Sequence, residues 1–185
     1  MFPIQADTCG HDAPCSILVA NWEIEMTPTE AAAALFNAMP QPLTVSQLEE
    51  YGVEASESTS SQIAREILSL NLYWILAAVD AHIPAKYRAA ITENLLESVR
   101  KAWWESGWCG ADTWDEYQPE LNDRQAHYAR LVDQEGINPM GVCAETASLM
   151  EDQGIISPED RAKLLVLLID YAPALEYGKL LEKVG

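Results

Sequence analysis

Apolar residues recur along most of the chain at the three- and four-residue spacing of an α-helix. The most regular segment is 61–83, where two apolar stripes run side by side. A helix that is apolar on two faces is packed by neighbours on both sides, so we expect 61–83 to be the central helix. The stripes are Ile63, Ile67, Leu70, Trp74, Ala77 and Ala81, and Leu68, Leu72, Ile75 and Val79.

Start and stop signals delimit further helices. Residues 27–30, Thr-Pro-Thr-Glu, form a capping box with proline at the first helical position, and 157–160, Ser-Pro-Glu-Asp, repeat the proline placement. Asp112 is the expected cap of a helix that Pro119 interrupts or restarts. The predicted helices are 28–39, 44–51 ending at Gly52, 61–83, 85–106 after Pro84, 112–134, 141–152, and a segment from 158 that Pro173 bends or breaks before 175–184.

Six or seven helices with short connections, and no alternation of strands with helices, predict an all-α bundle. We expect residues 27–185 to form one bundle domain. Residues 1–26 differ in pattern, because 1–15 are irregular and Trp22, Ile24 and Met26 alternate with polar residues. This period of two is typical of a strand, so an extended N-terminal arm or a short strand is expected there.

The balance of charge is strongly acidic. Eleven Lys and Arg against 29 Asp and Glu give a net charge of −18. Such a field repels nucleic-acid phosphates and anionic lipid and favours basic protein partners, although it also simply keeps a protein soluble. Segment 44–66 has the outline of a helix-turn-helix, but it is acidic too, so direct nucleic-acid binding is not expected.

No secretory signal opens the chain, since its first residues lack a basic segment followed by a long apolar one. The longest apolar run, 72–79, is far short of the roughly 18 residues of a membrane span. These features predict a cytoplasmic protein without membrane contact. The sequence does not predict an oligomeric state.

Four of the six tryptophans lie between Trp103 and Trp114. Gly107 stands where a left-handed residue ends a helix, so Trp103 and Trp108 are expected to close that helix in a Schellman motif. Trp114 shares a helical stripe with later apolar residues and is expected in the core. Trp104 differs, because its helical phase puts it on the charged face. Either another segment covers it, such as the N-terminal arm, or it is exposed as a contact for a partner.

Several charged residues are predicted on the core side of their helices. Arg88 and Arg124 both fall on apolar faces, with Glu120 and His127 one helical turn from Arg124. Buried arginines need carboxylate partners, so pairing with Asp80 or Glu120 is the simplest structural explanation. The functional alternative is a polar pocket inside the bundle that binds an anion or performs acid–base chemistry.

A third group of candidates is Cys9, His11 and Cys15, spaced C-x-H-x₃-C. Thiolates and imidazole are zinc ligands, but zinc prefers four, and this is not the paired C-x₂-C spacing of zinc sites. Free thiols are therefore the main expectation, with zinc or a redox disulfide as alternatives. No cofactor is predicted, and no E-x-x-H of the di-iron bundles occurs.

The residues favour a non-enzymatic acidic protein that contacts a basic protein partner. One variant is an acidic mimic that occupies a nucleic-acid-binding protein. The first alternative is an enzyme or small-anion-binding protein with a polar pocket near Arg124, His127, Glu120 and Asp80. The second is a metal or redox protein that uses the N-terminal cysteines. No nucleophile-elbow, phosphate-loop, dinucleotide-binding or H-E-x-x-H motif is present, which leaves the question of enzymatic activity open.

Overall fold

The computed structural model describes residues 26–110 and 112–182, and all regular elements within these ranges are helices. The prediction of an all-α, multi-helix bundle is confirmed. Two π-helical segments, η1 (Arg100–Trp104) and η2 (Arg130–Gln134), extend the α-helices that precede them. The α-helices are α1 (Pro28–Ala38), α2 (Val45–Glu50), α3 (Glu57–His82), α4 (Ala85–Val99), α5 (Trp114–Ala129), α6 (Pro139–Asp152), α7 (Arg161–Tyr171) and α8 (Ala174–Glu182).

The predicted N-terminal arm or strand lies outside the described residues, apart from Met26. Each helical segment expected from the sequence is present, and Pro173 separates α7 from α8 as two helices. None of the described helices is both long and apolar enough to cross a membrane.

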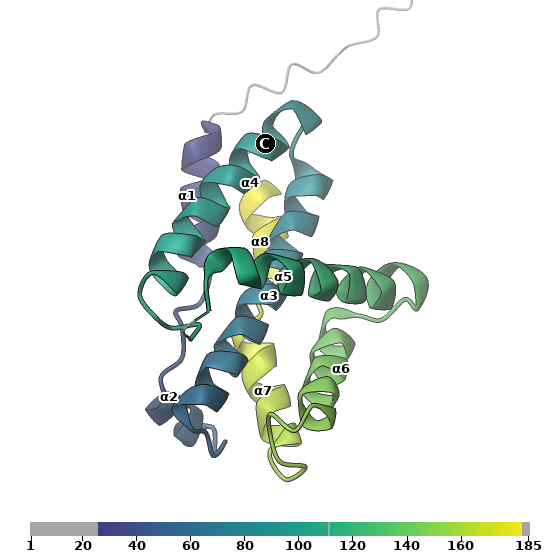
Figure 1. Cartoon of the computed structure of the whole chain (residues 1–185). Helices are drawn as coiled ribbons and strands as arrows, with labels where there is room; N and C mark the ends of the chain where they lie inside the picture. The colour runs from purple at the N-terminus through teal and green to yellow at the C-terminus, as the bar shows by residue number, and fades with distance from the viewer. Residues whose placement is uncertain (1–25, 111, 183–185) are drawn as a thin grey trace, which may run out of the picture.

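The central position of α3 is confirmed, since α2, α4, α5 and α8 all contact it. Figure 1 shows α1 beside α4 at one end of the molecule, α6 beside α7 at the other, and α5 lying across α3. The apolar stripes are buried along most of α3, but Ala77 and Ala81 near its C-terminus are exposed. The largest fully buried side chains include Trp103, Tyr117, Tyr128, Tyr177, Leu35, Leu48, Ile63, Ile67, Leu68, Leu70, Leu72 and Ile75.

Side-chain caps fix where the helices begin. The Thr27 capping box forms as predicted, with the Thr27 hydroxyl accepting from the Glu30 backbone N–H. The predicted cap Asp112 is wrong by one residue: Thr113 caps α5 and forms a reciprocal box with Glu116. Thr-x-x-Glu is the stronger signal because it satisfies two backbone donors at once.

Three other helix starts also differ from the prediction. Ser56 caps α3, so this helix begins earlier than expected, and Asn138 caps α6 with Pro139 at the first position. In the segment 157–160 the Ser157 hydroxyl donates to the Asp160 carboxylate, and α7 begins only at Arg161. The proline there lies in a turn rather than in the helix.

Pro119 does not interrupt α5. Its missing N–H removes the bond to the Asp115 carbonyl, one turn earlier. Both residues are exposed, so water can satisfy that carbonyl. The expected break is therefore wrong, and α5 runs unbroken from the Trp104 region to the far end of the molecule.

Candidate functional site

The tryptophan stretch closes a helix as predicted. Gly107 has φ of 79°, its N–H donates to the Trp104 carbonyl at 2.9 Å, and the Trp108 N–H donates to the Trp103 carbonyl at 3.2 Å. These two bonds define a Schellman motif. Trp103 is buried, whereas Trp108 is 39% exposed and is the exposed aromatic side chain of this stretch.

Trp104 is buried, with 8% of its surface exposed. The sequence-based phase assumed an α-helix up to residue 106, but the Glu105 N–H bonds to the Arg100 carbonyl five residues back, in the π-helical pattern. Each residue of this wider turn rotates less about the helix axis, so the Trp104 side chain points in a different direction from the one expected for an α-helix. Its Nε1–H donates to the Asp112 carbonyl at 2.6 Å.

The cover of Trp104 comes from α5. Its ring stacks on Tyr117 at 4.5 Å between centroids and meets the edge of Trp114 at 5.5 Å, while the Arg65 guanidinium lies 5.4 Å from its centre. Trp114 itself is partly buried against the core. Trp104 is therefore covered mainly by α5, and the little surface it keeps lies at a small hollow that Arg100 and Thr113 also line.

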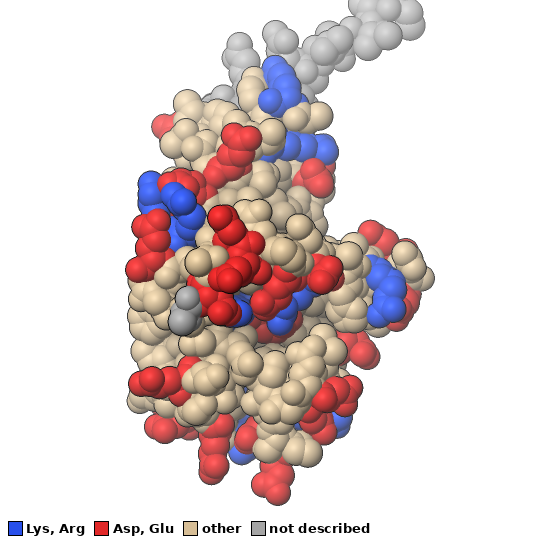
Figure 2. All heavy atoms as spheres, viewed as in Figure 1, with Lys and Arg blue, Asp and Glu red and all other residues tan. Residues whose placement is uncertain are grey.

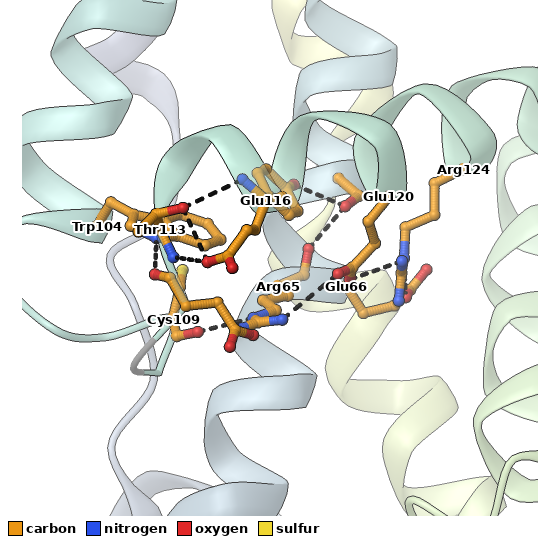
Figure 3. A network of polar contacts seen from close by, with 11 residues as sticks. Arg65, Glu66, Trp104, Cys109, Thr113, Glu116, Glu120 and Arg124 are labelled. Atoms are coloured by element: carbon orange, nitrogen blue, oxygen red, sulfur yellow. Dashed lines mark hydrogen bonds and ion pairs between the residues drawn. The ribbon is translucent and has the colours of Figure 1, made fainter.

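A buried carboxylate lies beneath Arg124. Glu66 on α3 is 1% exposed and accepts hydrogen bonds from Arg124 Nε and from the Tyr128 hydroxyl (Figure 3). The sequence reasoning missed Glu66 as the partner of Arg124. The signal was present, since Glu66 lies between Ile63 and Leu70 on the buried side of α3.

The network continues through alternating charges toward the tryptophans. Arg124 Nη1 pairs with Glu120 at 2.7 Å, as predicted, and Arg65 Nη1 lies 3.4 Å from the same carboxylate. Arg65 also pairs with Asp112 and donates from Nε to the Cys109 carbonyl at 2.7 Å. Figure 3 shows Arg65, Glu66, Glu120 and Arg124 in one row between α3 and α5.

The charges of this row shift the pKa values of Arg124 and Tyr128. Burial by itself lowers the pKa of Arg124, but the Glu66 and Glu120 carboxylates outweigh it and raise that pKa. Burial, followed by the Glu66 charge, raises the pKa of Tyr128 well above its usual range. The tyrosine therefore stays protonated and serves as a donor to Glu66.

A hollow of about 430 Å³ lies over Arg124. Three of the predicted pocket residues, Glu120, Arg124 and His127, line it together. His127 Nδ1 faces Arg130 Nη2 at 3.2 Å rather than Arg124. The remaining lining residues are Glu66, Asp123, Tyr128, Leu149 and Gln153.

Asp80 and Arg88 do not belong to this pocket. Asp80 is 14 positions from Glu66 on the same helix, which is about 21 Å along its axis. Arg88 pairs with Asp80 at 3.1 Å, as predicted, and donates from Nε to the Ile83 carbonyl at 2.7 Å. The side chains are 38% and 70% exposed, so the expected burial of Arg88 is wrong and the pair is a surface ion pair.

The predicted metal candidates Cys9, His11 and Cys15 lie outside the described residues. Within 26–110 and 112–182, no three His, Cys, Asp or Glu side chains are grouped so that they could hold a metal ion. Cys109 and Cys143 are free and buried, and burial raises the pKa of their thiols to about 12 and about 11.

A polar cleft of about 620 Å³ separates the start of α3 from the loop after η1. Trp108 stands at this cleft, and Arg65 is the basic residue of its lining. Because Arg65 already contacts two carboxylates and a carbonyl, the cleft has no uncommitted positive charge for an anionic ligand.

An apolar groove of about 480 Å³ lies where the N-terminus of α6, the C-terminus of α7 and the N-terminus of α8 meet. Met140, Ile169 and Leu175 line it and are 62%, 37% and 71% exposed. The sequence reasoning missed this α6–α8 groove, because its residues come from three helices. Its full lining is Asn138, Pro139, Met140, Cys143, Ile169, Ala172, Pro173, Ala174, Leu175 and Glu176.

The segments that form the groove are acidic, and of their acidic residues Glu176 is the one in the lining. Segments 133–145 and 169–182, which contain its lining, each carry three acidic residues, and Lys179 is their one basic residue. Lys179 Nζ lies 2.7 Å from the Glu176 carboxylate, so its charge is matched locally. The acidic residues, all exposed, are Asp133, Glu135, Glu145, Asp170, Glu176 and Glu182.

A second concentration of negative charge covers α5 and the loop before it. Figure 2 shows red side chains gathered across the middle of this face, where α5 lies in Figure 1. Asp115 and Glu116 sit in the first turn of α5, where they also complement the positive end of the helix dipole. The exposed acidic residues here include Glu105, Asp112, Asp115, Glu116 and Asp123.

The sequence matches no protein-family model, and neither the curated proteins nor the solved structures contain a significant match.

Proposed function

We propose that the protein is a non-enzymatic interaction protein that binds a basic protein partner. The observation that supports this most is the concentration of exposed apolar residues at the α6–α8 groove, whose segments carry more acidic than basic residues. Three of the five exposed large apolar side chains in the described residues line this one groove. Such residues are ordinarily scattered singly, and a concentration of them marks a contact surface.

Charge determines which partner fits. The chain carries −18, and the segments that form the groove carry six acidic residues against one lysine. A partner with a basic surface is attracted over distances up to about 10 Å at 0.1 M salt. An acidic partner is repelled by the same field, so charge contributes selectivity as well as attraction.

The Arg124 pocket gives less support to the alternative of an enzyme or anion-binding protein. An anion that enters it needs a positive group, but Arg124 is already bound by Glu66 and Glu120. Asp123 adds a further negative charge to the lining. The ionisable groups of this pocket therefore act mainly on one another, as a link between α3 and α5.

The test is capture of partners on immobilised full-length protein at low salt, elution with a salt gradient, and identification by mass spectrometry. Val166 is an exposed apolar residue on α7 outside the groove lining, so Val166→Asp is the matched control for Leu175→Asp. The proposal requires basic proteins that elute as salt rises and that Leu175→Asp, but not Val166→Asp, fails to retain. Retained proteins that are acidic or neutral would contradict it.

The captured partners also test the hypothesis that the protein mimics nucleic acid. The exposed carboxylates over α5 form the face on which such a mimic would depend (Figure 2). A partner of this kind is released by added DNA, because both ligands compete for one basic surface. If DNA does not release a basic partner, the nucleic-acid mimic is excluded, but the proposed interaction with a basic partner is not.

A further inference from the structure

We propose that the partner segment seated in the α6–α8 groove is an amphipathic α-helix with basic residues beside its apolar stripe. This inference rests on the proposed function, because it names the form of the basic partner. It goes further in committing to one site, one secondary structure and one charge pattern for the bound segment.

Three helices contribute the apolar surface of the groove. Met140, Ile169 and Leu175 each belong to a different helix and present apolar surface to the same hollow. A helix that docks in such a groove inserts residues spaced i, i+3 or i+4, and i+7 from one of its faces. Met140 is unbranched and polarizable, which allows it to adapt to different apolar side chains.

The backbone around the groove favours a helix over an extended segment. One way in which an extended peptide binds is the addition of a strand to a free sheet edge, and the described residues contain no strand. Pro139 and Pro173 line the groove and lack an N–H to offer. A bound helix satisfies its own backbone hydrogen bonds, so it needs only apolar side chains and charges from its site.

The charges specify the flanks of the bound helix. Glu176 lies in the lining and forms an exposed ion pair with Lys179, while Asp170, next to Ile169 on α7, accepts a hydrogen bond from the Tyr51 hydroxyl. The net negative charge of this region attracts lysines or arginines beside the apolar stripe of the partner. The other two exposed large apolar residues, Trp108 and Val166, do not line the groove.

The direct test uses three fluorescein-labelled synthetic peptides and the full-length protein. The first is an amphipathic leucine–lysine helix, the second replaces its lysines with glutamines, and the third keeps the lysines but has two prolines in its centre. Fluorescence anisotropy gives the dissociation constant of each with wild type, Leu175→Asp and Val166→Asp. Both variants add one negative charge to an exposed apolar position, but Leu175 lines the groove and Val166 does not.

The inference expects the leucine–lysine helix to bind at least about tenfold more tightly than either other peptide, and Leu175→Asp to weaken it by about tenfold. Val166→Asp should leave its affinity unchanged. Equal binding of the proline peptide would overturn the helical form while preserving a basic partner. Equal binding of the glutamine peptide would instead contradict the proposed function, and equal effects of both variants would overturn the groove as the site.

Two other occupants of the groove are conceivable, a second copy of the protein and residues 1–25 of the same chain. A photo-crosslinker, p-benzoylphenylalanine, in place of Leu175 in the full chain tests for both. Crosslinks to the added leucine–lysine peptide support the inference. If a second copy of the protein occupies the groove, crosslinks between two copies persist when the peptide is added. If residues 1–25 occupy it, crosslinks from position 175 to those residues of the same chain persist. Either persistent product would overturn the proposal.

Discussion

Glu66 and Arg124, 58 positions apart in the sequence, join α3 to α5 through a hydrogen-bonded ion pair. The Glu66 side chain is 2% exposed and that of Arg124 is 20% exposed, so the carboxylate depends on the guanidinium far more than the reverse. The Tyr128 hydroxyl provides the second hydrogen bond to Glu66. This pair fixes how α5 crosses the central helix.

Replacing Arg124 with Met should lower the free energy of unfolding by about 3 kcal/mol, because it leaves Glu66 buried without a counter-charge. Denaturant unfolding followed by circular dichroism measures the change. Arg88→Met is the control, since its partner Asp80 is 70% exposed, and its cost should stay below about 1 kcal/mol. An unchanged unfolding midpoint for Arg124→Met would favour a ligand role for this arginine.

A double variant separates the cost of an orphaned charge from the value of the pair. Glu66→Leu with Arg124→Met replaces both partners by apolar residues, so it should recover most of the stability that Arg124→Met loses. Additive losses in the double variant would instead show that Glu66 and Arg124 contribute to stability independently of each other.

Tryptophan fluorescence should separate Trp104 from Trp108. Acrylamide quenches exposed indoles, so Trp108→Phe should remove a readily quenched component while Trp104→Phe should leave that component in place. The physical reason is exposure, 39% for Trp108 against 8% for Trp104. Loss of the readily quenched component in Trp104→Phe alone would contradict the cover that Tyr117 and Trp114 provide.

The thiol of Cys109 should resist alkylation in the native protein even in alkaline buffer. Burial raises its pKa to about 12, so the thiolate that reacts is scarce, and the sulfur is also inaccessible. Iodoacetamide labelling, with each cysteine resolved by mass spectrometry, should modify Cys109 at pH 8.5 only when denaturant is added. Rapid native labelling at that pH would contradict the buried position.

The raised pKa of Cys109 has a consequence for stability. In the unfolded chain the thiol loses its proton near the ordinary cysteine pKa of 9.0, whereas in the folded protein it keeps the proton to about pH 12. The contribution of Cys109 is therefore fully present below pH 9 and is lost as pH rises toward 12. Cys109→Ala should flatten the decline in unfolding free energy over this range, and an identical decline in both proteins would argue against the raised pKa.

The cost of replacing Gly107 should depend only on how readily the new residue adopts a left-handed backbone conformation. Its φ of +79° is left-handed, and nothing lies within 4 Å of the position of an added Cβ. Gly107→Ala should therefore cost about 1 kcal/mol of unfolding free energy, and Gly107→Asn clearly less, because asparagine adopts this conformation more readily. Equal losses for the two variants in chemical denaturation would indicate that something other than the Schellman motif is affected.

Local signals in the sequence were enough to predict the helices and several of their ends. The Thr27 box, the glycine after η1 and the apolar stripes of α3 each depend on neighbours within a turn or two, and each prediction is confirmed. Trp104 was harder, because the π-helical hydrogen bond that rotates it is not encoded by apolar spacing. Thr113 was overlooked for the adjacent Asp112, although Thr-x-x-Glu is a readable signature.

The candidate sites depended on tertiary structure and were predictable only in part. Glu120 and Arg124 share one helix, so their pairing follows from spacing, whereas Glu66 reaches Arg124 only because α5 crosses α3. The α6–α8 groove has no sequence signature at all. Met140 and Leu175 are single apolar residues near helix starts, and only the meeting of three helices makes them one surface.

The most direct test of a basic partner at the α6–α8 groove is the affinity of the leucine–lysine peptide measured from 0.1 to 1 M salt. Screening shortens the range of charge interactions from about 10 Å to about 3 Å across this interval. The dissociation constant should rise steeply with salt for the wild type, and Leu175→Asp should bind more weakly at every salt concentration. An affinity that is independent of salt and unchanged by Leu175→Asp would contradict the central claim.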